Sequence, residues 1–175
     1  MRARALKRYP GPVRDKLGQK FSVSTPHSPY VYDVVLMSEG SSAPTPLILV
    51  ADDNRDSREM YGLYLSMLGY SVAVAVDGGE AVKKARALRP DLIVMDLDMP
   101  EVDGWTAISQ LQAEADTAPI PVIVLTGHDS KAYLKPAAIA AGAVSYLMKP
   151  CFPEDLAREV SARLAVRRAR AAAAL

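Results

Sequence analysis

Five residues combine acid, hydroxyl and amine groups with a shared local context: Asp52, Asp53, Asp96, Thr126 and Lys149. Each closes or follows a short apolar run of the kind that forms a buried strand. In an open parallel sheet the carboxyl ends of the strands meet at one edge, where ligands collect, so we expect these side chains to lie together. A lone carboxylate at a strand end is as readily a solvated surface group, so the prediction depends on the whole set.

The chemistry of such a set follows from its charges. Two carboxylates about 4 Å apart repel by roughly 4 kcal/mol near a protein surface. Protonation, the Lys149 ammonium or a bound cation must offset this repulsion. Mg²⁺ fits best, because it prefers oxygen ligands and keeps positions open for water and phosphate oxygens. An Asp96 oxygen could then attack an in-line phosphoryl group, with Lys149 and Thr126 contacting its equatorial oxygens.

The elements that position these residues alternate along the chain. Apolar runs at 47–51, 71–75, 92–95, 120–125 and 144–148 predict five strands. Capping residues and apolar periods predict helices from Asn54 or Asp53 to Gly69, from Asp77 to Pro90, from Asp103, from Pro136 to Ala141, and from Pro153. Short connections between alternating strands and helices predict an α/β fold, a doubly wound five-stranded parallel sheet with five helices.

Three helices carry more specific expectations. In the first helix the inner face is predicted to comprise Met60, Tyr64, Met67 and Leu68. In the fourth helix, Pro136 is expected at the first helical position, because proline lacks the amide proton that a helix interior needs. The last helix is predicted to bury Leu156, Val160 and Leu164.

Composition narrows the class of protein. Of 175 residues, 50% are hydrophobic and 23% charged, as in a globular protein. No apolar run approaches the roughly 20 residues that cross a bilayer, so no membrane contact is expected. Cys151 is the single cysteine; it excludes an internal disulfide, suits the cytoplasm and is interpreted as a small hydrophobe. His27 and His128 lie far apart and offer little for zinc binding or a histidine-based triad.

The ends of the chain differ from its middle. Residues 1–46 are rich in proline, serine and basic residues and are predicted to form a flexible N-terminal extension. Two other interpretations stay open: a cationic contact for an acidic partner, and translation that begins at Met37. A transit peptide agrees less well with the composition. Residues 47–170 are predicted to form the folded domain and 171–175 a tail.

Six motifs carry a resemblance to a known family. In order they are Leu-Val-Ala-Asp52-Asp53-Asn54, Ile-Val-Met-Asp96-Leu-Asp-Met-Pro100, Asp103-Gly104, Val-Leu-Thr126-Gly, Ala-Gly142-Ala and Tyr146-Leu-Met-Lys149-Pro150. Together they resemble the receiver domain of two-component response regulators, here expected to be a stand-alone, single-domain type. The resemblance implies a flavodoxin-like sheet of order 2-1-3-4-5. It also implies a cis bond between Lys149 and Pro150.

The same resemblance implies roles for the site residues. Asp96 would be the phosphoacceptor, and Asp52, Asp53 and Asp96 would ligate Mg²⁺ with the backbone carbonyl of Asp98. Thr126 and Lys149 would contact the phosphoryl group. The phosphoryl donor would be a histidine kinase or a histidine phosphotransfer protein.

Switching would follow from movement of Thr126 toward the new phosphoryl oxygens. Tyr146, at the family's switch position, would then turn inward and repack the face made by the fourth helix, fifth strand and fifth helix. A downstream protein target would bind this face, and a homodimer through it is a further option. Tyr146 could instead be a half-buried strand residue with its hydroxyl in water. His128 could orient a hydrolytic water or be an ordinary solvated loop residue.

Other functions agree less well with the residues. Asp96-Leu97-Asp98 resembles the signature of haloacid-dehalogenase-type phosphatases, with Asp96 as nucleophile and Asp98 as acid, but Pro100 and the third-strand position depart from that pattern. An interaction module that works without phosphorylation would not need the intact set of charged residues. DNA binding has only the basic extension and the arginines of the last helix in its favour, so nucleic acid is not an expected partner. We therefore expect a phosphoacceptor and not an enzyme, although it could catalyse its own phosphorylation and dephosphorylation.

Overall fold

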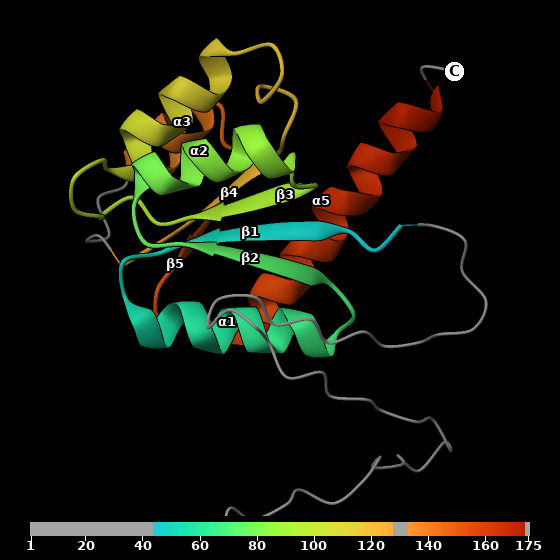
Figure 1. Ribbon diagram of the computed structural model, residues 1–175, viewed down its shortest axis with the longest axis horizontal. Helices are drawn as coiled ribbons and strands as arrows, with labels where there is room; N and C mark the ends of the chain where they lie inside the picture. Colours follow the sequence, from blue (N-terminus) through green and yellow to red (C-terminus); the bar gives the residue numbers. More distant parts are fainter. Residues whose placement is uncertain (1–43, 128–132, 174–175) are drawn as a thin grey trace, which may run out of the picture.

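A computed structural model of the protein describes residues 44–127 and 133–173. One parallel sheet organises it, with strands β1 (Leu47–Ala51), β2 (Ser71–Ala75), β3 (Leu92–Met95), β4 (Val122–Thr126) and β5 (Ser145–Met148) in the order β2-β1-β3-β4-β5. All neighbouring pairs are parallel, and the arrowheads in Figure 1 point to the same end of the sheet. The predicted fold and strand order are confirmed.

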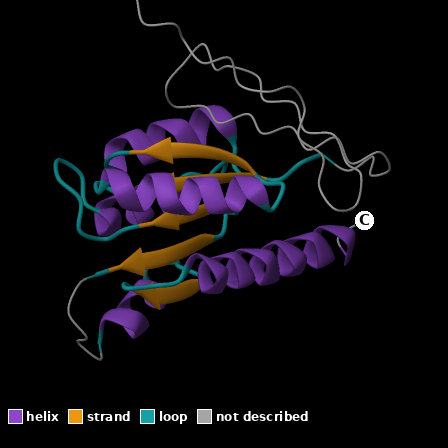
Figure 2. Ribbon diagram, turned by 90° about the horizontal axis from the view of Figure 1, so that it is seen from below, coloured by secondary structure: helices purple, strands orange, loops and turns teal. Residues whose placement is uncertain are grey.

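Helices cover both faces of this sheet, as Figures 1 and 2 show. They are α1 (Arg55–Met67), α2 (Gly78–Leu88), α3 (Gly104–Ala113), α4 (Leu134–Ala140) and α5 (Pro153–Ala173). Residues of α2, α3 and α4 belong to one core cluster, and residues of α1 and α5 to the other. No helix in the described ranges is both long and apolar enough to cross a membrane.

The strands are apolar at consecutive positions because both of their faces are buried. In β1, Leu49 lies in the core cluster of α2, α3 and α4, whereas Ile48 and Val50 lie in that of α1 and α5. In β3, Ile93 and Val94 divide between the two clusters in the same way. Side chains alternate across a strand, so a strand with helices on both sides needs an uninterrupted apolar run.

Side-chain caps begin three of the helices where the sequence predicts them. Asn54, Asp77 and Asp103 each accept a hydrogen bond from the amide three residues ahead, at 2.9, 2.8 and 2.7 Å. Each cap gives one of the unpaired first-turn amides a partner. Since Asn54 and Asp103 lie close in sequence to Asp52 and Asp96, the caps also define how the chain leaves the acidic edge of the sheet.

The predicted inner face of α1 is wrong. Met67 and Leu68 are 65% and 53% exposed, and Met60 is exposed as well. The buried residues are instead Tyr61, Gly62, Leu65 and Ser66, with Tyr64 only partly buried. The helix carries two neighbouring apolar stripes, and the structure buries the one that contains Tyr61 and Leu65. A Cβ on Gly62 would lie 3.7 Å from Val72 Cγ1, which is an ordinary contact distance. Packing against the sheet therefore selects the buried face of α1, which the helical period alone leaves open.

The start of α4 also differs from the prediction. The helix begins at Leu134, so that Pro136 is its third residue. The first four amides of a helix have no partner within it, and a proline there removes no helical hydrogen bond. The helix ends before Gly142, whose φ of 111° is unfavourable for other residues. In α5 the predicted inner residues Leu156, Val160 and Leu164 are buried.

Candidate functional site

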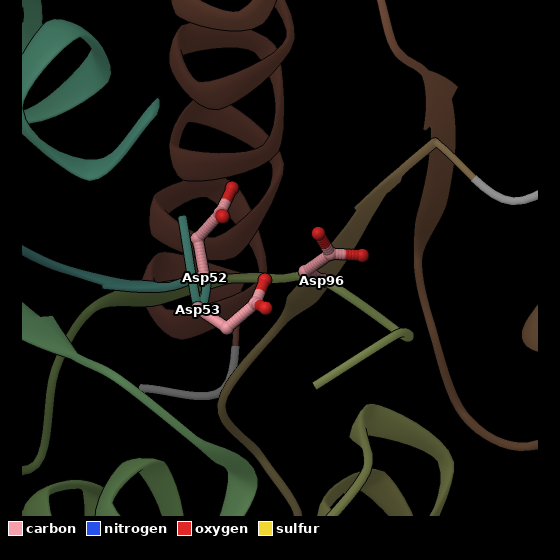
Figure 3. A group of neighbouring side chains, drawn as sticks. All are labelled: Asp52, Asp53 and Asp96. Atoms are coloured by element: carbon pink, nitrogen blue, oxygen red, sulfur yellow. The ribbon is translucent and has the colours of Figure 1, made fainter. Parts of the chain in front are cut away.

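Three carboxylates meet at the carboxyl edge of the sheet (Figure 3). Asp52, Asp53 and Asp96 each offer an oxygen, and these oxygens lie within 4.8 Å of one another. Asp52 and Asp96 are 2% and 4% exposed, whereas Asp53 is exposed to solvent. The predicted convergence of these acids is therefore present, with two members withdrawn from water and one facing it.

Strand register explains this convergence. Ala51 pairs with Met95 in the parallel β1–β3 ladder, so Asp52 and Asp96 are the next residues of adjacent strands. The Asp96 amide donates to the Ala51 carbonyl at 2.8 Å, which extends the ladder to the acids. Thr126 pairs with Met148 in the β4–β5 ladder, so Lys149 leaves the sheet one residue beyond the partner of Thr126.

Lys149 ties the two buried acids together. Its Nζ donates to Asp52 Oδ2 at 2.6 Å and to Asp96 Oδ2 at 2.5 Å, and its side chain is only 20% exposed. Lys149, which precedes the cis Lys149–Pro150 bond, is thus held over the carboxyl edge of the sheet. With all four groups ionised, one ammonium among three carboxylates leaves two negative charges uncompensated.

The remaining oxygens of the two buried acids are held by backbone amides. Asp52 Oδ1 accepts from the amide of Asn54 at 2.9 Å, and Asp96 Oδ1 accepts from the amide of Asp98 at 3.2 Å. Each acid therefore uses one oxygen for an amide two residues ahead and the other for Lys149. This repeated pattern fixes the orientation of both carboxylates.

Burial and nearby charges compete in setting the pKa values of Asp52 and Lys149. Burial raises the pKa of Asp52, and the Asp96 charge adds to this, against the opposing effects of Lys149 and the Asn54 amide. Burial alone would lower the pKa of Lys149, but its hydrogen bonds to Asp52 and Asp96 and their charges hold it above its usual value. Lys149 therefore remains a cation at neutral pH.

Thr126 and Tyr146 lie on the neighbouring strands. Thr126 is fully buried at the end of β4, and its carbonyl accepts from the Lys149 amide at 2.9 Å. Tyr146 pairs with Val124 in the ladder and packs, partly buried, on the core cluster of α2, α3 and α4. Burial raises the pKa of its hydroxyl. Tyr146 thus lies on the strand that leads to Lys149, whereas His128 lies outside the described residues.

Gly104 is required by the packing at Asp96. A Cβ at this position would lie 2.0 Å from the Asp96 carbonyl oxygen and 2.8 Å from Leu97 Cα. The Gly104 amide also donates to the Leu97 carbonyl at 3.0 Å. The Asp103-Gly104 motif therefore caps α3 and lets that helix approach the backbone of Asp96.

Arg58 is the site-lining residue that sequence reasoning missed. From the first turns of α1, its Nη1 donates to the carbonyls of Asp52 and Asp53 at 2.6 and 2.7 Å. Its position one turn after the Asn54 cap was the available signal, because a long side chain there can reach back toward the chain that enters the helix.

Comparisons with known proteins agree with this geometry. The sequence profile of the "Response regulator receiver domain" family matches residues 48–161. Response regulator MprA of Mycolicibacterium vanbaalenii is 42% identical over 117 residues, which cover 67% of this chain and 49% of the relative. The chain thus spans about half the length of the curated relatives it matches.

Solved structures give the same result. A putative response regulator from Chloroflexus aurantiacus is similar with a TM-score of 0.66 and 32% identity, covering 70% of this chain and 99% of that one. The chemotaxis response regulator CheY4 of Vibrio cholerae is similar with a TM-score of 0.64 and 30% identity, covering 69% and 99% of the two chains.

Proposed function

We propose, from the premise that the chain belongs to the family of response regulator receiver domains, that Asp96 accepts a phosphoryl group from a phosphohistidine of a histidine kinase or a histidine phosphotransfer protein. The observation that carries the proposal is the bridge from Lys149 to Asp52 and Asp96 beside the exposed Asp53. The Asp96 carboxylate, which would be the nucleophile, lies with a cation and two further acids at one edge of the sheet. The family match favours this function over the phosphatase alternative.

The residues present fit a magnesium ion. The site offers oxygen donors from three carboxylates that lie within 4.8 Å of one another, and it has two uncompensated negative charges. We propose that Asp52, Asp53 and Asp96 hold the ion together with the backbone carbonyl of Asp98. When bound, Mg²⁺ would offset the repulsion between these acids and an incoming phosphoryl group.

The chain's own residues would then perform the transfer. An Asp96 carboxylate oxygen attacks phosphorus, the P–N bond to the donor histidine breaks, and its electron pair leaves with the imidazole. Lys149, already hydrogen-bonded to Asp96, would follow the charge onto a phosphoryl oxygen, and Thr126 would donate its hydroxyl to another. Water attack on phosphorus would later release phosphate and restore the Asp96 carboxylate.

Output would pass through the face formed by α4, β5 and α5. Thr126 ends β4 beside this face, and Tyr146 lies on β5 with its ring only partly buried. We propose that movement of Thr126 toward the phosphoryl group makes room for Tyr146 to turn inward. The exposed apolar residues Ile139, Val144 and Met148 support a protein partner there, either a downstream target or a second copy.

We further propose that the domain acts in the cytoplasm, where Cys151 would stay reduced. It would be a phosphoacceptor that catalyses its own phosphorylation and dephosphorylation without turning over a free substrate. Asp98 is solvent-exposed beside the site, and its charge would influence how fast phosphate is lost.

The proposal is tested by labelling with acetyl phosphate, read by intact mass. The natural sequence should gain one phosphoryl mass in Mg²⁺ and none in EDTA. Asp96→Asn should gain none while keeping its circular dichroism, whereas the matched variant Asp98→Asn should still be labelled. Normal labelling of Asp96→Asn would reject Asp96 as the acceptor.

A further inference from the structure

The side chain of Arg58 holds the backbone on both sides of one acid. Its Nη1 donates to the carbonyl of Asp52 at 2.6 Å and to the carbonyl of Asp53 at 2.7 Å. These two carbonyls belong to the peptide groups that flank the Cα of Asp53. One guanidinium nitrogen therefore restrains both peptide planes that determine the direction of the Asp53 Cα–Cβ bond.

Asp53 depends on that restraint more than the other two acids do. The carboxylates of Asp52 and Asp96 are each oriented by a backbone amide and by Lys149. Within the described part of the chain, no such donor contacts the Asp53 carboxylate, which is exposed. Its backbone fixes the direction of the Cα–Cβ bond and so limits where the rotamers of the carboxylate can reach.

The platform that carries Arg58 is itself well fixed. The Arg58 amide donates to the Asn54 carbonyl at 3.1 Å, and Asn54 caps the helix by accepting from Ser57. Arg58 is half-buried, and its hydrogen bond to the Asp52 carbonyl is partly buried, whereas that to the Asp53 carbonyl is exposed. A planar guanidinium loses less freedom per hydrogen bond than a lysine ammonium does.

We propose that Arg58 is a positioning residue that orients Asp53 as a ligand for the divalent cation of the acidic site. The inference rests on the proposed function, because it assumes that this site binds Mg²⁺. Arg58 itself would contact neither the phosphoryl group nor the cation. It acts through the two carbonyls beside Asp53, and its loss would let that carboxylate sample directions that do not face Asp52 and Asp96.

If Arg58 acted on the cation only through its charge, its removal would change Mg²⁺ affinity in the opposite direction. The two effects, charge and positioning, can therefore be separated. Removing a positive charge near a cation site strengthens cation binding, by an amount that solvent screening keeps small. Removing a positioning contact weakens it. The sign of the change in Mg²⁺ affinity therefore distinguishes orientation of Asp53 from a simple field effect.

The test measures the Mg²⁺ dissociation constant of the unphosphorylated full chain by isothermal titration calorimetry. Arg58→Met, which keeps much of the side-chain length, should weaken binding about tenfold. Arg58→Lys, which keeps the charge and can reach a carbonyl with one ammonium, should weaken it about threefold. The matched control is Arg158→Met, which removes an equal charge from an exposed ion pair with Asp155 in α5 and should change the constant less than twofold.

The possible outcomes separate the claims. Unchanged or tighter Mg²⁺ binding by a folded Arg58→Met protein would overturn the role of Arg58 while leaving the metal site intact. If that variant does not fold by circular dichroism, Arg58→Lys decides, and a constant equal to that of the natural sequence overturns the role. Absence of Mg²⁺ binding by the natural sequence would reject the proposed metal site and this inference with it.

Discussion

Replacing Asp53 with asparagine should stabilise the metal-free protein and remove its response to Mg²⁺. In the folded state the Asp53 carboxylate lies within 4.8 Å of oxygens from Asp52 and Asp96. Those two acids share the Lys149 ammonium and so present about one net negative charge to Asp53. Asparagine keeps the shape of the side chain and removes the repulsion.

The magnitude follows from Coulomb's law. At 4.8 Å, the limit within which these oxygens lie, two unit charges repel by about 3.5 kcal/mol at an effective dielectric constant of about 20, and by about 0.9 kcal/mol in bulk water. Asp53 is exposed, so the lower value is the better guide and a gain of about 1 kcal/mol is expected. With a urea dependence of about 1.5 kcal/mol per molar, the unfolding midpoint should rise by about 0.7 M.

The assay is urea unfolding in EDTA and again in Mg²⁺. Mg²⁺ at about ten times its dissociation constant should stabilise the natural sequence by about 1.4 kcal/mol through binding linkage, and Asp53→Asn by much less. Asp56→Asn is the matched control: Asp56 lies in the first turn of α1, where its charge favours the helix dipole. That variant should therefore lose about 0.5 kcal/mol and keep the full Mg²⁺ response. Destabilisation of Asp53→Asn in EDTA, or an unchanged Mg²⁺ response, would refute the reasoning.

Three further expectations test other parts of the structure. Gly104→Ala should destabilise the protein by about 1–3 kcal/mol in urea unfolding and slow labelling by acetyl phosphate, because its Cβ would overlap the Asp96 carbonyl; unchanged stability would contradict the tight packing. In the same assay Leu65→Ala should lower the free energy of unfolding by about 2–4 kcal/mol and Met67→Ala by less than about 1 kcal/mol, since only Leu65 is buried. The reverse order would support the inner face of α1 that the sequence predicts. Cys151 should react with iodoacetamide at about pH 7.5 more slowly than free cysteine does, because burial raises the pKa of its thiol and leaves less thiolate; a faster reaction would mark it as an activated cysteine.

Sequence reasoning succeeded where the signal is local. The apolar runs located all five strands of the described ranges, and the caps Asn54, Asp77 and Asp103 located three helix starts. A buried strand and a helix N-terminus are each specified by a few consecutive residues. Convergence of the acids followed from parallel connectivity alone. The strand order came from the resemblance, since no property of the individual strands specifies their neighbours.

The errors arose where tertiary contact decides between local alternatives. Both apolar stripes of α1 satisfy a helical period, and only packing in the folded protein shows that the one with Tyr61 and Leu65 is buried. The contact from Arg58 to two carbonyls depends on the shape of the turn after β1, which a sequence pattern does not encode. The position of Pro136 inside the first turn of α4 is likewise permitted by helix geometry and not required by it.

The proposed function requires that the carboxyl ends of the strands bring the acids and Lys149 together so that Asp96 forms an acyl phosphate. This is tested by treating the protein with acetyl phosphate in Mg²⁺, reducing it with borohydride and mapping the peptides by mass spectrometry. We expect homoserine in place of aspartate at position 96, and none when EDTA replaces Mg²⁺. Homoserine at another position, or a phosphoryl group that resists reduction, would contradict the assignment of Asp96.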